Sequence, residues 1–255
     1  MGAVASCAGV IRTEHIMGMP IVFDVRDVDD PAALDPLVAW LRFADETFST
    51  YLADSQINRF NRGELTLEDA HPLVREVVIL CEELRVQTGG FFDARAARAD
   101  YVDPSGLVKG WAVERAADLA VELGWRNFAI NAGGDIRLRG GALPAPRWRI
   151  GIQHPGDAGE IVGVVAGDDL AVATSGTYER GEHVLDPHTR RPPVGVASVT
   201  VTGRNLATAD ALATAIFAMG AEGPAWSAQL CDHEAFIVLE DGRSLRTPRF
   251  PLAAG

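Results

Sequence analysis

The chain has 255 residues, of which 47% are hydrophobic and 23% charged, the balance of an ordinary globular protein rather than a disordered or fibrous one. Its 23 basic and 35 acidic residues give a formal net charge of −12, so the surface repels phosphate backbones and nucleic acid is not an expected partner. Three widely spaced cysteines without a CxxC pair indicate neither a disulfide framework nor a zinc site.

The apolar runs of the sequence are too short for a membrane segment, which needs roughly 18 consecutive apolar residues. The N-terminal residues show no basic start followed by an apolar stretch, as a signal peptide would. We therefore expect a cytoplasmic protein by default. The oligomeric state is not determined by any feature of the sequence.

Four segments have the apolar spacing of helices. The first covers about 32–48, and the second covers about 73–84, ahead of Gly89 and Gly90. The third begins near Lys109 and stops at Gly124, and the fourth runs from about Thr208 to Gly220.

Eight short, often β-branched segments bounded by Gly, Pro or Asp predict strands. They are 21–25, 128–131, 148–152, 161–165, 170–174, 183–185, 197–202 and 235–239. Many of the connections are too short for a helix, which favours antiparallel pairing. The expected fold class is therefore α+β: one integrated body with a mostly antiparallel sheet and flanking helices.

Lys109 is the only lysine in the chain, since the other 22 basic residues are all arginine. A compact ammonium group retained at one position indicates a role that a guanidinium cannot fill. With Gly106 before it and Gly110 after it, Lys109 is expected at a helix N-terminus, where backbone N–H groups and a point charge bind an anion. The alternative is a solvated surface cation.

Two further places have small residues after an apolar strand. The sequence Asn131-Ala132-Gly133-Gly134-Asp135 allows a ligand to approach the backbone closely, although Gly-Gly-Asp also forms ordinary tight turns. Thr174-Ser175-Gly176 follows another strand, with His183 a few residues later. No nucleophile-elbow motif surrounds Ser175, so we expect it to donate a hydrogen bond to a phosphate rather than to act as a nucleophile. For His183, the alternative to a catalytic role is a structural one.

Asp210 and Thr214 lie four residues apart on the fourth helix and therefore share one face. A carboxylate and a hydroxyl, completed by a backbone carbonyl, water and a ligand phosphate, form the kind of site that Mg²⁺ prefers. The alternative is structural: Asp210 complements the helix dipole and Thr214 bonds back to a carbonyl.

Taken together and in order, these segments resemble the FAD:protein FMN transferases, the ApbE family. The resemblance covers most of the chain, and we expect one domain of this kind over residues 12–250. The motifs that carry it are Met17-Gly18, Phe48-Ser49-Thr50-Tyr51, Asp54-Ser55, Asn58, Thr88-Gly89-Gly90-Phe91-Phe92-Asp93, Val108-Lys109-Gly110-Trp111-Ala112-Val113-Glu114, Asn131-Ala132-Gly133-Gly134-Asp135, 148–151, 173–176, 183–187 and Ala209-Asp210-Ala211-Leu212-Ala213-Thr214-Ala215.

The resemblance implies an Mg²⁺-dependent enzyme that transfers the FMN moiety of FAD to a Thr or Ser hydroxyl of an acceptor protein and releases AMP. It also implies a ligand cleft between two halves of the fold. Asp210, Thr214 and the carbonyl of Val108 would hold the metal, and His183 would be the general base, with Lys109 also catalytic. The FAD-binding residues implied are Met17, Tyr51, Phe91, Phe92, Asp93, Lys109, Glu114, Ser175 and Gly176.

The chain departs from the usual family pattern at four positions. Phe91 stands where alanine is usual, Arg190 replaces a glycine, Glu114 replaces an aspartate and Met19 replaces a threonine. Two other functions stay open at this point: hydrolysis of FAD to FMN and AMP, and flavin binding without turnover.

Overall fold

The structure is a computed structural model that describes residues 9–96, 98–177 and 184–253. Within these residues, eight strands form one sheet in which every neighbouring pair is antiparallel. In spatial order they are β1 (Val10–Ile16), β2 (Met19–Val25), β3 (Phe128–Ala132), β4 (Asp135–Arg139), β7 (Asp169–Gly176), β8 (Val196–Gly203), β9 (Glu234–Leu239) and β10 (Ser244–Arg246).

Two further strands, β5 (Trp148–His154) and β6 (Asp157–Gly167), pair with each other as a separate antiparallel ribbon. The last described residues of the chain follow its outer edge, where the Ala253 N–H donates to the carbonyl of Val164. The ribbon therefore interacts with the C-terminal segment rather than extending the large sheet.

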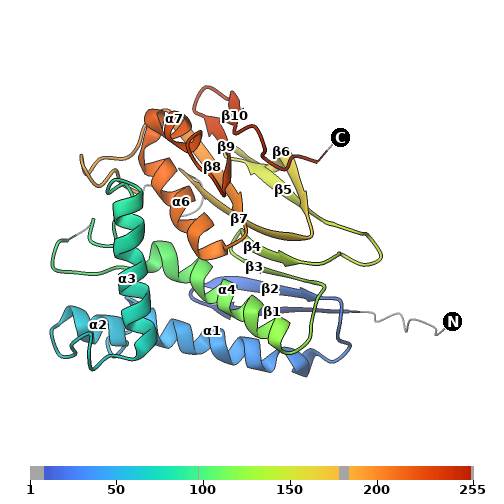
Figure 1. Ribbon diagram of the computed structural model, residues 1–255, viewed down its shortest axis with the longest axis horizontal. Coiled ribbons are helices and arrows are strands. Elements are labelled where there is room, and N and C mark those ends of the chain that lie inside the picture. The colour runs from blue at the N-terminus through green and yellow to red at the C-terminus, as the bar shows by residue number, and fades with distance from the viewer. Residues whose placement is uncertain (1–8, 97, 178–183, 254–255) are drawn as a thin grey trace.

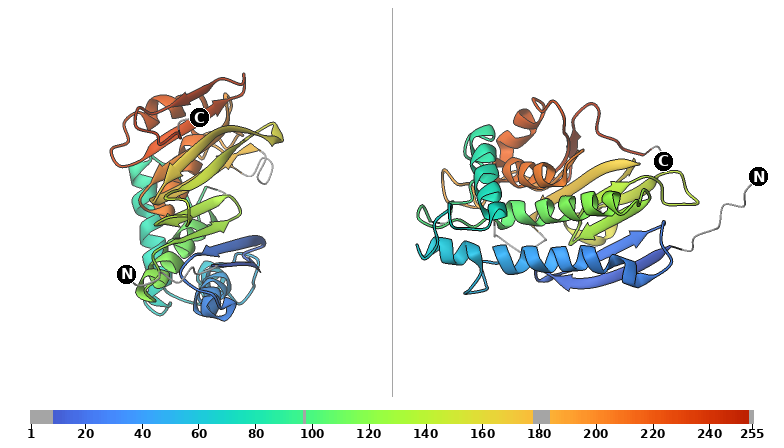
Figure 2. Two further views of the ribbon diagram at one scale, coloured as in Figure 1. Left: turned by 90° about the vertical axis from the view of Figure 1, so that its right-hand side faces the viewer. Right: turned by 60° about the horizontal axis from the view of Figure 1, so that its bottom comes forward.

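The helices lie together against one face of the large sheet (Figures 1 and 2). Those of eight or more residues are α1 (Asp35–Phe48), α3 (Pro72–Gln87), α4 (Ser105–Glu122) and α6 (Leu206–Ala218). Shorter helical segments among the described residues are η1 (Pro31–Leu34), α2 (Gln56–Asn61), η2 (Gly220–Glu222) and α7 (Gly223–Ser227). This arrangement confirms the expected α+β class with an antiparallel sheet and flanking helices.

Alternation along the strands shows which face each side chain covers, because successive residues of a strand point to opposite faces. In β7, Ala171 and Ala173 belong to the main core under the helices, whereas Val172 packs with Phe236 under the β5–β6 ribbon. The same alternation places Ser175 on the helix face and Thr174 on the ribbon face. The sheet thus separates the helix layer from the β5–β6 ribbon. The two layers approach each other near the C-terminal end of β7.

Helices α4 and α6 pack closely where Gly110 faces the start of α6. A Cβ atom on Gly110 would lie 2.6 Å from the carbonyl oxygen of Leu206 and 2.9 Å from Cβ of Asp210, distances that real Cβ contacts do not reach. Only glycine fits here without movement of a helix backbone. This close approach brings Lys109 and Asp210 into one neighbourhood.

Most predicted elements are confirmed, with boundary shifts of a few residues. The third helix is the main correction: it begins at Ser105, so Lys109 lies one turn inside it and not at its N-terminus. Gly106 does not break the helix, because Asp103 accepts a hydrogen bond from the Ser105 N–H and Gly106 packs against the Phe92 ring.

The strand expected over 183–185 is also corrected in part. His183 lies outside the described residues, and Val184 and Leu185 are not in a strand. Instead, the Asp186 carboxylate accepts hydrogen bonds from the His188 N–H and the Thr189 hydroxyl, which closes a turn. The strands β1, β4 and β10 were not predicted.

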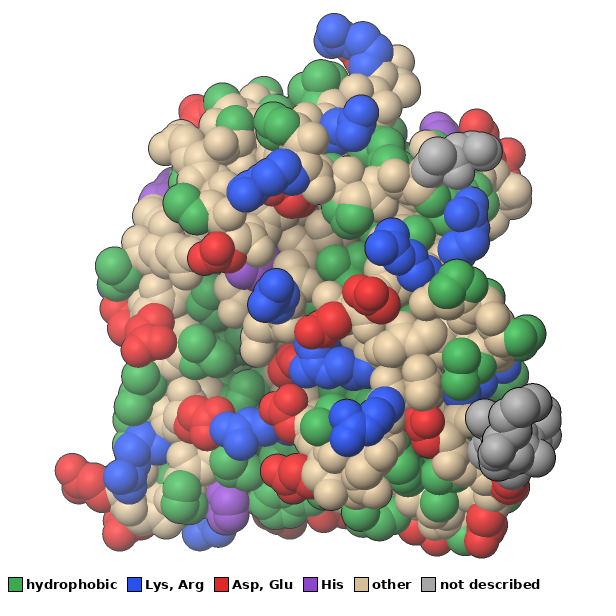
Figure 3. Space-filling view, turned by 45° about the vertical axis from the view of Figure 1, so that its right-hand side comes forward, with side chains coloured by type: hydrophobic (Ala, Val, Ile, Leu, Met, Phe, Trp, Pro, Cys, Tyr) green, Lys and Arg blue, Asp and Glu red, His purple; other side chains and the backbone are tan. Residues whose placement is uncertain are grey.

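No helix among the described residues is both long enough and apolar enough to cross a bilayer. On the face drawn in Figure 3, acidic and basic side chains are interspersed and neither sign forms a continuous area.

Replacing Gly110 with alanine should destabilise the protein by about 1–3 kcal/mol, because the added methyl group overpacks the contact between α4 and α6. The measurement is the unfolding free energy from urea titration. Val121→Ala on the exposed side of the same helix is the control, with an expected change within about 0.5 kcal/mol. Equal stabilities of Gly110→Ala and wild type would contradict the described packing.

Candidate functional site

Two cavities of similar size lie on either side of the sheet edge. The helix-side cavity has a volume of about 560 Å³ and the ribbon-side cavity a volume of about 530 Å³. The first lies between the β1–β2 turn, α1, the N-terminal part of α4 and the middle of α6, and the second lies between the sheet and β5. Gly18, Met19 and Lys109 line both cavities. The two cavities adjoin through these shared residues, and the ligand cleft between two halves of the fold stays a prediction.

The turn between β1 and β2 forms one wall of this site. Met17 and Gly18 both have positive φ, 56° and 72°, and Met17 is one of the two non-glycine residues described with this conformation. Such a conformation is strained for methionine. The Asp45 carboxylate in α1 accepts a hydrogen bond of 3.2 Å from the Met17 N–H, which holds the turn against the helix-side cavity.

Lys109 reaches from α4 to two buried carboxylates. Its Nζ atom lies 2.7 Å from Oδ2 of Asp135 and 3.8 Å from Oδ1 of Asp210. Asp135 comes from the first position of β4 and Asp210 from the second turn of α6. Each carboxylate also accepts a backbone hydrogen bond, Asp135 from Thr174 and Asp210 from Gly110.

When both carboxyl groups are ionised, they carry more negative charge than the single Lys109 ammonium neutralises. Burial raises the pKa of Asp210 well above its usual value, and the nearby Asp135 raises it further, while Lys109 acts in the opposite direction. A buried carboxylate with a raised pKa gains free energy from an additional cation more than a solvated one does. The cluster of Lys109, Asp135 and Asp210 is therefore suited to bind positive charge from a ligand or metal.

The hydroxyl and carbonyl donors expected around a metal lie at the same cavity. Thr214 is one turn after Asp210 on α6, and its Oγ1 lies 3.3 Å from Oγ of Ser175. Val108 precedes Lys109 on α4, and all of these residues line the helix-side cavity. Among the described residues, no three His, Cys, Asp or Glu side chains form a metal-binding group. The donor set would have to use hydroxyl, carbonyl and ligand oxygens with one carboxylate.

Several expected FAD-binding residues line the helix-side cavity, and others do not. Met17, Tyr51, Lys109 and Ser175 line it, and the Tyr51 side chain is 91% exposed at its margin. Gly176, the last residue of β7, is buried but lines neither cavity.

The segment Phe91-Phe92-Asp93 lies beside the cavities rather than in them. The Phe91 ring packs edge-on against His188, with centroids 4.6 Å apart, so its bulk is directed to that loop. Phe92 is buried against Gly106, and Gly106 lines the helix-side cavity. The Phe92 ring therefore packs behind the cavity wall without reaching the cavity itself. The Asp93 carboxylate accepts a hydrogen bond from the Arg95 N–H.

Arg190, at the position where the family usually has glycine, has a φ of 56°. This left-handed conformation is one that glycine adopts without steric cost. A glycine at this position, as the sequence resemblance leads us to expect, would adopt this turn freely, whereas arginine adopts it with some strain.

Glu114 lies in a buried network away from both cavities. Its Oε1 atom accepts a hydrogen bond of 2.9 Å from Nε of Arg137, and its Oε2 atom accepts one of 2.6 Å from the Leu206 N–H. Burial raises the pKa of Glu114, against the opposing effects of Arg137 and Leu206. Since both oxygens already have partners, this placement gives no support to direct FAD contact by Glu114.

Sequence reasoning missed Asp135 as a site residue. It was noted only as the end of the Gly133-Gly134 turn, yet it is fully buried against Lys109. The sequence alone does not distinguish the two interpretations, because an aspartate directly after two glycines is compatible with a tight turn and with a ligand-binding site. His183, the expected general base, lies outside the described residues.

Replacing Asp210 with asparagine should change how stability depends on pH. Because the pKa of Asp210 is higher in the folded than in the unfolded state, the folded protein binds the extra proton, and the unfolding free energy falls as pH rises above the usual aspartate value. This loss amounts to at most about 1.4 kcal/mol per pH unit. The variant should lack it and be more stable than wild type at neutral pH.

The measurement is urea unfolding of both proteins, without metal or ligand, at a series of pH values from acid to neutral. Asp100→Asn is the control, because its side chain is 76% exposed. Parallel curves for wild type and Asp210→Asn would contradict the burial of an uncompensated carboxylate at this position.

Comparison with known proteins gives consistent results. Residues 94–237 match the model of the ApbE family. An FAD:protein FMN transferase of Vibrio cholerae is 39% identical over 132 residues, which are 48% of this chain and 40% of the relative. One of Rhodobacter capsulatus is 34% identical over 156 residues, which are 58% of this chain and 30% of the relative. The matches therefore span less than half the length of these curated relatives.

Solved structures match over nearly the whole chain. The flavin transferase ApbE from Vibrio cholerae has a TM-score of 0.82 and 26% identity, covering 96% of this chain and 99% of that one. An ApbE protein from Thermotoga maritima has a TM-score of 0.83 at 22% identity, covering 95% and 98%. The second likeness supports the fold alone.

Proposed function

Because the chain belongs to the ApbE family, we propose that it is an FAD:protein FMN transferase that moves the FMN moiety of FAD to a Thr or Ser hydroxyl of an acceptor protein and releases AMP. FAD is then a substrate and Mg²⁺ a cofactor. Relatives named for this activity support the proposal, and the arrangement of the two cavities supports it independently.

The observation that carries the proposal is that Lys109 lines both cavities. A dinucleotide has two bulky ends joined by a diphosphate, so it requires two neighbouring spaces with positive charge at their junction. The Lys109 ammonium, together with the metal ion proposed below, would supply this charge in a chain whose net charge is strongly negative. We assign the diphosphate to this junction.

The residues around Asp210 fit a magnesium ion. The carboxylate is nearly fully buried, its charge is incompletely neutralised, and the Thr214 hydroxyl lies one turn away on the same cavity. Asp210, Thr214 and the carbonyl of Val108 would hold the ion, all with the hard oxygen atoms that Mg²⁺ prefers. When bound, Mg²⁺ neutralises charge on the diphosphate.

In the proposed transfer, an acceptor hydroxyl oxygen forms a bond to the phosphorus of the FMN half, and the bond from this phosphorus to the bridging oxygen breaks. AMP leaves with that oxygen, and the hydroxyl proton passes to a base. Lys109 stabilises the charge on the diphosphate oxygens, and Ser175 donates a hydrogen bond at the cavity wall. His183 is the proposed base, and this assignment depends on the sequence resemblance.

The direct test is to mix the protein with FAD, Mg²⁺ and a flavin-acceptor protein and to measure covalent flavin fluorescence on the acceptor. Wild type should form the adduct, and Asp210→Ala should lower the rate at least about 100-fold, because a metal-holding carboxylate is lost. Asp100→Ala, at an exposed position, should keep the wild-type rate.

The other two functions give different products in the same assay. Release of AMP at a rate that the acceptor does not change would indicate FAD hydrolysis instead. Tight FAD binding without AMP release would indicate a flavin-binding protein. Either result would reject the proposed transfer.

Replacing Lys109 with arginine should weaken FAD binding at least about ten-fold, or about 1.4 kcal/mol, even though the charge is kept. The compact ammonium lies 2.7 Å from Asp135 and 3.8 Å from Asp210, with 19% of its side chain exposed, and a larger planar guanidinium would place its N–H donors differently. Binding is measured by quenching of flavin fluorescence, and Arg115→Lys, an exposed change on the same helix, is the control. Unchanged FAD affinity in Lys109→Arg would contradict the inference that position 109 requires a lysine.

A further inference from the structure

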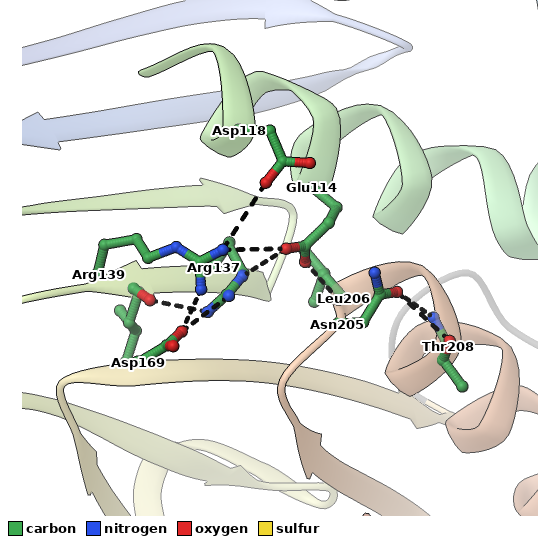
Figure 4. A network of polar contacts seen from close by, with 9 residues as sticks. Glu114, Asp118, Arg137, Arg139, Asp169, Asn205, Leu206 and Thr208 are labelled. Atoms are coloured by element: carbon green, nitrogen blue, oxygen red, sulfur yellow. Dashed lines mark hydrogen bonds and ion pairs between the residues drawn. The ribbon is translucent and has the colours of Figure 1, made fainter. Parts of the chain in front are cut away.

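A buried ion pair that the proposed chemistry does not use lies next to the site. Arg137 in β4 is fully buried, and its guanidinium contacts Glu114 on one side and Asp169 on the other, with Nη2 2.8 Å from Oδ1 of Asp169 (Figure 4). Arg139 also contacts Asp169 and lies 3.5 Å from Glu114. Asp169 is half exposed, whereas the Glu114–Arg137 pair is buried, and a buried pair of this kind seldom adds stability over apolar residues, so its presence calls for another explanation.

The network joins four of the elements that form the site. Each of these elements contributes one group to the cavity region and another to the network. The pairs, with the site residue first, are Lys109 and Glu114 on α4, Asp135 and Arg137 on β4, Ser175 and Asp169 on β7, and Asp210 and Leu206 on α6.

The contact with α6 is the one that bears on the site. Leu206 is the first residue of this helix, so its N–H has no acceptor within the helix. Oε2 of Glu114 accepts that N–H at 2.6 Å, and a carboxylate at a helix N-terminus also interacts favourably with the helix dipole. Asp210 lies four residues after Leu206, one turn further along α6.

A second contact between the same two helices runs in the opposite direction. The Gly110 N–H of α4 donates to Oδ2 of Asp210, while the Leu206 N–H of α6 donates to Glu114. Gly110 and Glu114 are four residues apart, as are Leu206 and Asp210. These two contacts therefore fix both the rotation of α6 and its position along α4.

We propose that Glu114, held by Arg137, is a positioning residue that sets the register of α6, so that Asp210 and Thr214 face the cavity beside Lys109. The metal and FAD part of this inference rests on the proposed function, whereas the part concerning α6 does not. Glu114 acts through Asp210 and does not itself touch FAD.

The test replaces the ion pair with apolar residues of similar size, in the double variant Glu114→Leu with Arg137→Met. Apolar replacement of the ion pair itself should cost little stability, but the buried Leu206 N–H loses its acceptor, so the variant should fold with a thermal midpoint moderately below that of wild type. The Leu206 amide should exchange with solvent at least ten-fold faster, since its acceptor is lost. The Mg²⁺ concentration needed for half-maximal FAD binding should rise at least ten-fold.

Glu114→Gln is a second variant of nearly unchanged volume, to be used if the double variant does not fold. Its amide oxygen can still accept one hydrogen bond, but it has no charge for Arg137, so smaller changes of the same sign are expected. Glu82→Gln removes an exposed ion pair on α3 and should leave both readouts unchanged.

Wild-type exchange of the Leu206 amide together with wild-type Mg²⁺ dependence in a folded double variant would overturn the inference. If wild type binds no FAD, the proposed function fails, and the amide exchange of Leu206 alone decides whether Glu114 holds α6.

Discussion

The arrangement of the site depends on one ammonium group placed between two buried carboxylates. Lys109 lies 2.7 Å from Asp135 and 3.8 Å from Asp210, and these residues come from three different elements. Removing two carboxylates from water costs more free energy than one ammonium recovers. An additional cation near the two carboxylates would therefore be stabilised, and the Lys109 ammonium at the cavities would attract an anion. The first property suits a metal ion and the second suits a diphosphate.

The fold meets the requirements of this cluster with small residues and antiparallel strands. Gly110 allows α4 to approach the start of α6 so closely that its own N–H reaches Asp210. The Gly133-Gly134 turn has positive φ at both residues and brings the chain directly into β4, whose first residue is Asp135. The Glu114–Arg137 pair then joins these elements behind the site.

Local patterns in the sequence predicted much of this fold. The helices α1, α3 and α6 were found because their apolar residues recur at helical spacing, and the face shared by Asp210 and Thr214 followed from the same spacing. The predicted start of α4 near Lys109 was wrong, because the helix begins at Ser105 and Gly106 packs within it.

Strand β4 was missed for a different reason. Its sequence Asp135-Ile136-Arg137-Leu138-Arg139 alternates polar and apolar residues, which suggests one solvated face, yet Asp135 and Arg137 are fully buried. Their partners Lys109, Glu114 and Asp169 are distant in the sequence, so no local pattern reveals them. The same limit applies to Glu114, because its contact with Leu206, on which the proposed positioning role rests, spans 92 positions of the sequence.

The central claim is that this cluster binds a divalent cation together with the diphosphate of FAD. The most direct measurement is the dissociation constant of FAD with and without Mg²⁺, for wild type and Asp210→Ala. The account predicts that Mg²⁺ tightens binding at least about ten-fold in wild type, worth about 1.4 kcal/mol, and has no effect in the variant. Binding that is independent of Mg²⁺ in both proteins would contradict it.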